Sequence, residues 1–591
     1  MSDIKTLVEL FETSCQLRGD APLFGTRSGE HFDWISYASM HQRVAELRLL
    51  LRGLGITRGD RVALIADNSI EWAGICYAVA GCAAITVPMY TAQSHSDWEY
   101  ILKDSGAKVA FLGSKRVAEG LESIQPHLRE LEHAIPIFGS PSEPASLNAR
   151  LAALSGRTAP IEHPDANDPA GFIYTSGTTG HPKGVVLSHW NIVSNVVAGA
   201  STFPLSASDR SLSFLPWAHA LGQTVDLHLL LHVGCQIGLN GELSELLSNL
   251  RIVKPTILIS VPRVFCRIYD GVRKQIAARP RAIRALFSKG VAAATKVSQS
   301  AHLNWGDRIW LSLAERLIFN RVRQRFGGKL RFAISGSAAL NRDVAEFVNA
   351  LGIEVYEGYG LSEASPVVSV NTPTARKFGT VGMPIPGVSV TIEPNVGDDP
   401  AVGEIIVSGP NVMQGYYRSP EDTARVLTPD GRLRTGDMGR LDEDGFLIIT
   451  GRIKEQFKLQ NGKYVVPTPI EEQIKLSPLI DNCMLYGSDK PYCVLLVVPN
   501  LQALEAEVHS RGFSGPNTDG DPKAVALLKQ EVSSRVKGLN AYMRPKKLLI
   551  VPEDFTVDNG LLTPSLKVRR QEVILKYQGR LSKIYDDSFV E

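Results

Sequence analysis

Apolar runs of strand length alternate with segments of helical length along much of the chain. The runs lie at 61–66, 84–89, 108–112, 172–175, 236–239, 256–261, 332–334 and 354–356. Asn68 or Ser69 stands where a side chain can cap a helix over 70–83. Residues 139–170 are rich in Pro, Ser and Ala with little periodicity, which predicts a surface connection. Strands that alternate with helices are typical of layered α/β structure with a mostly parallel sheet.

The pattern changes after residue 379. Short strands separated by turns, typical of a small antiparallel sheet or barrel, are expected at 388–392, 403–407 and 445–450. The final part has a hairpin signal over 457–466, a strand at 493–498 and two helical runs. We therefore predict an α/β protein whose large N-terminal domain, 1–451, consists of layered α/β subdomains plus a small β-barrel-like part. A small α+β C-terminal domain over 452–591 follows.

Composition excludes several classes of protein. A chain of 591 residues exceeds one compact core, and 44% hydrophobic with 21% charged residues excludes a disordered polypeptide. The formal net charge of +2 argues against a nucleic-acid binder. The seven cysteines form no C-x-x-C pair, which argues against structural zinc. The N-terminus lacks the apolar region of a signal peptide, and the C-terminus lacks a prenylation box or peroxisomal tripeptide. We expect a cytoplasmic protein.

Two stretches bear on membranes. The longest apolar run, 72–90, contains Gly and Ala throughout and is interpreted as a buried helix followed by a strand rather than a membrane span. Residues 271–331 hold fourteen Lys or Arg and only two acids, Asp307 and Glu315, interspersed with aromatic and leucine residues. This basic stretch fits either a peripheral contact with anionic lipid or two helices with a solvated basic face.

The strongest chemical signal is the segment YTSGTTGHPKG at 174–184, between a predicted strand and an apolar run. Glycines, backbone N–H groups and hydroxyls can wrap an anion, and Lys183 adds a positive charge. The segment does not align with a Walker A loop.

This segment resembles the phosphate loop of the adenylate-forming superfamily, which includes acyl-CoA synthetases, carrier-protein adenylation domains and beetle luciferases. Further segments are similar to family motifs in the family's order: FLPWAHA at 214–220, SVPRVF at 260–265, SGSAAL at 335–340, YEGYGLSE at 356–363, RTGDMG at 434–439, GRIK at 451–454 and LTPSLK at 562–567. Ala339 stands where a Pro is frequent, and Ser362 replaces a Thr while keeping the hydroxyl. The SVPRVF segment and the helix-rich stretch 265–330 resemble the long-chain fatty acyl-CoA synthetase branch.

The resemblance implies a set of roles for acyl-AMP formation. Lys567 would hold the carboxylate and bridging oxygen, Glu363 would ligate Mg²⁺, and His219 would lie beside the acyl carboxylate. ATP would be bound by a larger group: Thr175, Ser176, Gly177, Thr178, Thr179, Gly180 and Lys183 at the phosphates, Gly336 and Ser337 at adenine, and Gly358, Tyr359, Gly360 and Ser362 in the next motif. Asp437 would accept hydrogen bonds from the ribose, and Arg452 would donate to ribose or phosphate. Core packing is an alternative role for His219 and Tyr359.

A second step needs a thiol to attack the acyl-adenylate. In the family the C-terminal domain rotates at a hinge between the two steps, and Lys454 matches the hinge residue. By this rotation Lys567 would leave the active site and the hairpin after the hinge would enter it. Lys458 and Gly462 fall on that hairpin, where glycine permits close approach of a pantetheine arm. Pantetheine belongs either to CoA or to an acyl carrier protein, and the residues separate these two acceptors poorly.

The resemblance therefore implies an ATP-dependent long-chain fatty acid:CoA ligase that forms AMP, with ATP, Mg²⁺ and CoA required. The alternative is the same adenylation with acyl carrier protein as acceptor. Three other classes remain: a serine hydrolase, because residues 360–364 are one position short of G-x-S-x-G; a carrier-protein adenylation domain; and a luciferase-type oxidase. A non-catalytic relative would be expected to lose Lys567 or Glu363, and both are present.

Overall fold

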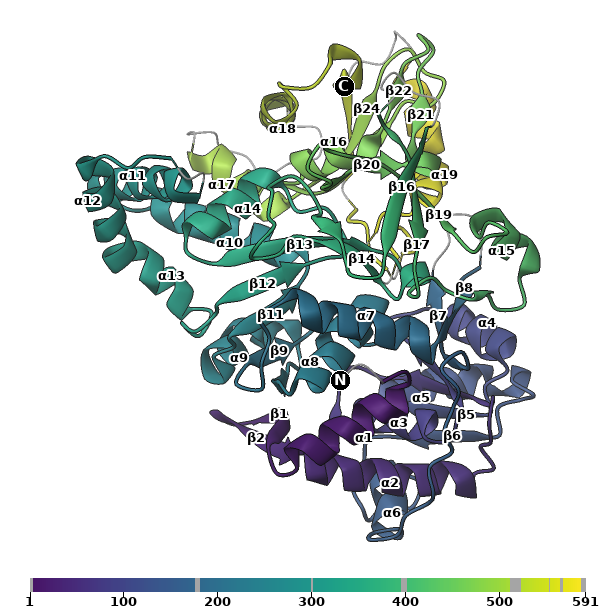
Figure 1. The fold of residues 1–591 in the computed structure, drawn as a ribbon. Coiled ribbons are helices and arrows are strands. Elements are labelled where there is room, and N and C mark those ends of the chain that lie inside the picture. Colours follow the sequence, from purple (N-terminus) through teal and green to yellow (C-terminus); the bar gives the residue numbers. More distant parts are fainter. Residues whose placement is uncertain are drawn as a thin grey trace. The chain divides into compact units, whose positions relative to one another are not determined.

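Figure 1 shows the fold in a computed structural model. The structure describes residues 4–175, 181–298, 301–394, 401–510, 522–551, 553–557, 559–563 and 567–585. The chain forms two units. The larger unit comprises Met1–Thr391, Ile406–Thr435 and Asp442–Leu447, and the smaller comprises Ile392–Ile405, Gly436–Leu441 and Ile448–Glu591.

A seven-stranded sheet with the order β18-β8-β7-β4-β3-β5-β6 lies in the larger unit. Its strands are β3 (Arg61–Ile65), β4 (Ile85–Met89), β5 (Val109–Leu112), β6 (His133–Pro136), β7 (Pro169–Thr175), β8 (Lys183–Ser188) and β18 (Gly415–Tyr416). Neighbours from β6 through β7 run parallel, whereas β8 and β18 add antiparallel pairs. The predicted α/β sheet is therefore confirmed, with an antiparallel edge.

The apolar run 72–90 forms a buried helix and strand, as predicted. Ser69 caps α3 (Ile70–Ala80) by accepting a 3.0 Å hydrogen bond from the Trp72 backbone N–H. The chain turns at Gly81 and enters β4, whose residues are all buried. Among the helices that the structure describes, none is both long and apolar enough to cross a bilayer.

The larger unit also contains many helices. They include α1 (Leu7–Arg18), α2 (Tyr37–Gly53), α4 (His95–Ser105), α5 (Lys115–Ile124), η1 (Gln125–His127), α7 (His189–Thr202), the π-helix η2 (Gly222–Leu229), α8 (Leu230–Val233), η3 (Leu243–Glu245) and α9 (Leu246–Val253). The sequence predicts an irregular connection over 139–170, but this segment contains α6 (Leu147–Ala152), with Leu147 and Leu151 buried. Six residues are too few to give a helical period in the sequence.

Two further sheets complete the α/β part. One has the order β2-β1-β10-β9, from His31–Ser36, Pro22–Ser28, Gln236–Leu239 and Arg210–Ser213. The other has the order β11-β12-β13-β14-β15, from Ile257–Ser260, Phe332–Ser335, Glu354–Gly360, Val367–Val370 and Met383–Pro384. Between β11 and β12 the chain forms α10 (Pro262–Ala277), α11 (Arg281–Ser298), α12 (Trp305–Ala314), η4 (Glu315–Phe319) and α13 (Asn320–Gln324), and α14 (Arg342–Ala350) precedes β13. These helices confirm the prediction that residues 265–330 are rich in helix.

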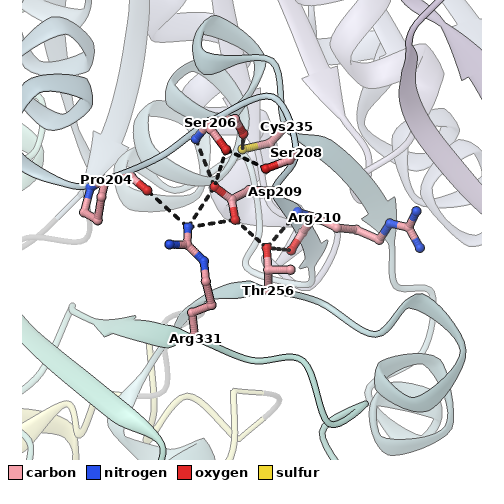
Figure 2. A network of polar contacts seen from close by, with 8 residues as sticks. All are labelled: Pro204, Ser206, Ser208, Asp209, Arg210, Cys235, Thr256 and Arg331. Atoms are coloured by element: carbon pink, nitrogen blue, oxygen red, sulfur yellow. Dashed lines mark hydrogen bonds and ion pairs between the residues drawn. The ribbon is translucent and has the colours of Figure 1, made fainter.

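A buried carboxylate ties these two sheets together (Figure 2). Both oxygens of Asp209 accept from Nη2 of Arg331, at 2.8 and 2.9 Å, and the Thr256 hydroxyl donates to Asp209 at 2.6 Å. The Ser206 backbone N–H adds a 2.9 Å bond. Asp209 precedes β9, Thr256 precedes β11 and Arg331 precedes β12, so one buried charge fixes the starts of three strands.

A four-stranded sheet has the order β16-β17-β19-β20. Its strands are Ser389–Pro394, Gly403–Ser408, Leu433–Leu441 and Leu447–Arg452, and α15 (Pro420–Val426) lies between β17 and β19 in sequence. The small sheet expected after residue 379 is present.

The smaller unit has a three-stranded sheet of order β23-β24-β25, from Ile480–Tyr486, Val494–Pro499 and Lys547–Ile550. Alternate residues of β24 enter two apolar clusters: Leu495 and Val497 pack on one side, and Leu496 and Val498 on the other. The remaining elements are η6 (Ile453–Glu455), β21 (Phe457–Lys458), β22 (Tyr464–Val465), α16 (Pro467–Ile474), α17 (Leu501–Ser510), α18 (Pro522–Arg535), η7 (Ala541–Met543) and α19 (Arg570–Lys583). The sequence predicts two helical runs here, whereas the described residues form four α-helices.

Candidate active site

The anion-binding segment predicted at 174–184 connects two adjacent antiparallel strands. Thr175 is the last residue of β7 and lies opposite Lys183, the first residue of β8. The His181 ring stacks on Tyr100 with centroids 4.5 Å apart. Ser176, Gly177, Thr178, Thr179 and Gly180 lie outside the described residues. The structure thus places both flanks of the predicted phosphate loop, with Lys183 at its C-terminal flank.

Lys183 is held by two side chains from the 415–426 segment. Its ammonium lies 2.8 Å from Asp422 and 5.3 Å from the centroid of the Tyr416 ring. The hydrogen bond from Lys183 lowers the pKa of Asp422, which therefore stays ionised. Strand β18 brings Tyr416 here by pairing with β8, opposite Val185. An ion pair and a cation–π contact fix the position of the lysine.

Tyr416 also contacts the predicted metal ligand. Its hydroxyl donates a 2.8 Å hydrogen bond to Oε1 of Glu363. Burial raises the pKa of Tyr416, so the phenol keeps its proton and acts as a donor. Glu363 belongs to η5 (Ser362–Ala364), and its carbonyl accepts from the Met413 backbone N–H at 2.9 Å. Glu363, Tyr416 and Lys183 therefore form one connected group.

The strand before Glu363 carries three more predicted residues. Gly358, Tyr359 and Gly360 end β13 and are half-buried. A Cβ on Gly360 would lie 2.0 Å from the Pro366 carbonyl oxygen, so this position requires glycine. The close approach lets the chain fold back immediately after β13, which positions Ser362 and Glu363.

The SGSAAL segment is anchored by a residue that the sequence did not single out. Glu357 is buried, and its Oε1 accepts from the Leu340 backbone N–H at 2.7 Å. Burial raises the pKa of Glu357 to about 8. Gly336 donates to the Ser260 carbonyl at 3.2 Å, and Ser337 has a left-handed φ of 69°. Both predicted adenine-pocket residues thus lie on a loop attached to β11 and β13.

His219 lies on a turn held by Asn68. The Asn68 side chain donates to the Leu215 carbonyl at 2.7 Å and accepts from the Trp217 backbone N–H at 2.8 Å. The His219 ring is half-buried, and its Nδ1 accepts from the Leu221 backbone N–H at 3.2 Å. A Cβ on Gly336 would lie 3.0 Å from Leu221, so the His219 turn adjoins the SGSAAL loop. Asn68 therefore positions this turn, while Ser69 alone caps α3.

Two predicted ribose-site residues contact each other in the smaller unit. Asp437 on β19 is buried, and its Oδ1 lies 2.9 Å from Nε of Arg452 on β20. The pair presents one half-exposed guanidinium and one shielded carboxylate. This arrangement suits hydroxyl groups, because the carboxylate accepts hydrogen bonds and the guanidinium donates them.

The predicted thioester-step residues lie on the β21–β22 hairpin. Lys458 pairs with Tyr464 across the strands, and its ammonium lies 5.5 Å from the centroid of the Tyr464 ring. Gly462 forms the turn with φ 84°, and a Cβ at this position would meet no described atom within 4 Å, so the surface there is open. The predicted hinge residue Lys454 lies on η6, just beyond the end of β20.

Lys567 is exposed and follows residues 564–566, which lie outside the described part of the chain. Its backbone N–H donates to the Thr563 hydroxyl at 3.0 Å, and its carbonyl accepts from the Thr563 backbone N–H at 2.8 Å. Further along the chain, Arg570 binds both carboxylate oxygens of buried Glu471, at 2.8 and 2.5 Å. The lysine segment is therefore attached to the body of the smaller unit.

Sequence reasoning missed Tyr416, Asp422, Glu357 and Arg570. Tyr416 and Asp422 lie in GYYRSPED at 415–422, where a Pro followed by acids signals a helix start. That signal predicts α15 but not the contact with Lys183. Arg570 follows the LTPSLK segment closely, and its partner Glu471 is 99 positions away.

The donor set fits a magnesium ion held jointly with a phosphate ligand. No group of three or more His, Cys, Asp or Glu side chains arranged for a metal occurs among the described residues. Mg²⁺ is commonly held by one or two carboxylates, with phosphate oxygens and water completing its shell. Glu363, half-buried and hydrogen-bonded by Tyr416, supplies one carboxylate.

The chain is similar to known proteins over most of its length. Residues 11–417 match the family described as AMP-binding enzyme, and 454–588 match the AMP-binding enzyme C-terminal domain. The chain is 34% identical over 576 residues to the long-chain-fatty-acid–CoA ligase FadD15 of Mycobacterium bovis, and the alignment covers 93% of this chain and 92% of the relative. It is 30% identical over 614 residues to long-chain-fatty-acid–CoA ligase 1 of Cavia porcellus, covering 99% and 87%.

A solved structure supports the same fold. The anthranilate CoA ligase AuaEII in complex with anthranoyl-AMP aligns with a TM-score of 0.74 at 20% identity, covering 98% of each chain. The fold, the family match over most of the chain and the near full-length relatives lead to one conclusion: this chain belongs to the AMP-binding enzyme family.

Proposed function

We propose that this protein is an ATP-dependent long-chain fatty acid:CoA ligase. In the first step a carboxylate oxygen of the fatty acid bonds to the α-phosphorus of ATP, and the bond to pyrophosphate breaks. In the second step the thiol sulfur of CoA bonds to the acyl carbon, AMP leaves and the thiol proton is released. The observation that carries the proposal is the linked group of Lys183, Tyr416 and Glu363 at the C-terminal flank of the predicted phosphate loop, in a chain whose near full-length relatives are named long-chain-fatty-acid–CoA ligases.

The larger unit supplies groups for the ATP phosphates and base. Lys183 and the loop residues Thr175 to Gly180 would bind the β- and γ-phosphates, because repulsion between two anions otherwise opposes the first step. Glu363 would hold Mg²⁺, which neutralises charge on the phosphates when bound. Ser362 would contact a phosphate. Gly336, Ser337 and Tyr359 would form the adenine pocket, and His219 would lie beside the fatty acid carboxylate.

The smaller unit supplies groups for both steps. Asp437 and Arg452 would bind the ribose, and Lys567 would stabilise the carboxylate and the oxygen that bridges it to phosphorus. Lys458 and Gly462 would serve the thioester step. We propose that 1–451 is the adenylation domain and that 452–591 is a mobile C-terminal domain that turns at Lys454 between the steps. Family matches over 11–417 and 454–588 support this division.

The test combines purified protein, ATP and Mg²⁺ with fatty acids of graded length and with CoA, acyl carrier protein or no acceptor. Pyrophosphate and thioester products are measured by mass spectrometry. We expect CoA thioesters with a maximum at long chains. If thioester forms only on acyl carrier protein, the proposed adenylation stands, but the acceptor is acyl carrier protein and not CoA. Absence of pyrophosphate with every acid would contradict the proposal.

A further inference from the structure

Helix α12 and its continuation η4 carry a row of exposed apolar side chains. Trp305 is 79% exposed, and Ile309, Leu313 and Leu317 are 46%, 42% and 43% exposed. Their spacing of four residues places them on successive turns of one helix face. We call these four residues the 305–317 ridge. Contiguous rows of exposed apolar side chains are uncommon on surfaces that face water, and interaction sites are one place where they occur.

The opposite side of the same helices is already used for packing. A Cβ on Gly290 of α11 would lie 2.2 Å from the Ala314 Cβ, so α11 and α12 are in close contact. The Phe287 ring packs against Phe319 and against Phe347 of α14, with centroids 6.1 and 5.9 Å apart. The buried faces of these helices thus pack within the larger unit, whereas the four ridge residues remain 42% to 79% exposed.

Positive charge accompanies the ridge. Arg308 and Arg316 are exposed and directly precede Ile309 and Leu317, which places them along the edge of the ridge. The two acids of the stretch 271–331 are each paired with a base: Asp307 lies 2.8 Å from Lys296, and Glu315 binds Arg323. Each pair is neutral, so the exposed charged residues within 305–317 are the two arginines.

We propose that the 305–317 ridge docks this protein on the surface of an anionic lipid bilayer. Trp305, Ile309 and Leu313 enter the boundary between headgroups and acyl chains, and Arg308 and Arg316 face the lipid phosphates. The proposal deepens the proposed function, because a long-chain fatty acid partitions into bilayers and a docked enzyme draws on that pool. Binding itself requires neither ATP nor catalysis.

The charge pattern favours a bilayer over a second copy of the chain. Two copies facing each other through this ridge would bring arginines against arginines, which costs free energy. An anionic surface instead offers complementary charge to every arginine at once. A tryptophan beside leucine and isoleucine suits the interface of a membrane, where one part of the side chain is apolar and the other is wet.

The test is flotation of the purified full chain with vesicles of phosphatidylcholine alone or with added phosphatidylglycerol, at low and high salt. Two ridge variants are compared: Trp305→Ser with Ile309→Ser, and Arg308→Glu with Arg316→Glu. A matched control changes two other exposed leucines with the same spacing, Leu243→Ser and Leu247→Ser. Each variant is also assayed for adenylation of a short, water-soluble fatty acid. This activity shows that the variant is folded, and it tests the proposed function independently of vesicle binding.

We expect the wild type and the leucine control to bind phosphatidylglycerol vesicles, with weaker binding at high salt. Each ridge variant is expected to bind about tenfold more weakly, while its adenylation of the short acid stays unchanged. Equal vesicle binding by all variants, or no binding by the wild type, overturns the proposal. A change in oligomeric state of the ridge variants by light scattering, without a change in vesicle binding, would assign the ridge to self-association instead.

Discussion

The Tyr416 hydroxyl donates a 2.8 Å hydrogen bond to the Glu363 carboxylate, although the two residues are 53 positions apart. The same tyrosine ring lies beside the ammonium of Lys183. One side chain therefore sets the positions of the predicted metal ligand and of a predicted phosphate-binding cation. The contribution of this hydrogen bond to acyl-AMP formation can be measured by removing the Tyr416 hydroxyl.

Tyr416→Phe is expected to reduce the rate of acyl-AMP formation about tenfold and to raise the Mg²⁺ concentration needed for half-maximal rate. A hydrogen bond to a charged group contributes about 1.5–3 kcal/mol, and its loss frees Glu363 to rotate. The measurement is pyrophosphate release against Mg²⁺ concentration. Tyr417→Phe, which removes a hydroxyl from the neighbouring ring that packs against Phe172, is the control. Equal effects of both variants would contradict a specific role for Tyr416.

Glu357 predicts a pH dependence of stability. Its pKa rises from 4.5 to about 8 on folding because the carboxyl is buried. The folded state keeps this proton to higher pH than the unfolded state, so the free energy of unfolding falls as pH rises from about 4.5 to 8. The expected slope from this group is about 1.4 kcal/mol for each pH unit within that window.

Glu357→Gln removes the titration and retains an oxygen that accepts from Leu340. Thermal or urea unfolding across this pH range should show a smaller decline for the variant than for the wild type. Glu122→Gln, on an exposed position of α5, should follow the wild type. Parallel pH profiles for Glu357→Gln and the wild type would show that Glu357 does not carry a raised pKa.

Arg570 connects the lysine segment to the rest of the smaller unit. It binds both oxygens of Glu471 and lies 3.9 Å from Glu455, which follows Lys454 directly. Arg570→Lys keeps the charge but loses the paired hydrogen bonds. We expect acyl-AMP formation to fall about tenfold, with a smaller effect on thioester formation from supplied acyl-AMP. The neighbouring Arg569→Lys is the control, and equal loss in both steps would point to a general structural role.

Changing Asp209 is expected to lower the free energy of unfolding, although this residue lies outside the candidate active site. Asp209→Asn leaves Arg331 without its buried anionic partner at the junction of three strands (Figure 2). The change weakens charge-assisted hydrogen bonds to a buried carboxylate, and because the Arg331 side chain is 45% exposed to solvent we expect a cost of about 2 kcal/mol. Urea unfolding measures the difference. Asp430→Asn, in the exposed pair with Arg432, is expected to leave the unfolding curve unchanged. Similar curves for both variants would contradict the role of the network.

Much of the fold follows from local patterns. The pattern predicts the strands β3, β4 and β10 to within one residue, because strands buried on both faces are continuous apolar runs. Ser69 and the run after it predict the helix α3. In contrast, α6 escapes prediction because a six-residue helix shows no period.

The candidate site is less accessible to sequence reasoning. Motif order points to Lys183, Glu363 and Lys567, and their roles stay predictions. The partners of these residues come from long-range pairing: β18 places Tyr416 beside β8, and Glu471 reaches Arg570 across 99 positions. Glu357 looks like an ordinary strand residue inside a motif, and only the structure shows that it faces the Leu340 backbone.

The central claim is that one chain makes acyl-AMP with Lys567 and then passes the acyl group to CoA without it. The most direct measurement follows both half-reactions of Lys567→Ala: acyl-AMP and pyrophosphate from ATP and a long-chain fatty acid, and acyl-CoA from supplied acyl-AMP. We predict a loss of the first reaction by about a hundredfold or more, because the cation assigned to the bridging oxygen is removed, while the second reaction is retained. An equal fall in both half-reactions, or an unchanged first reaction, would contradict the account.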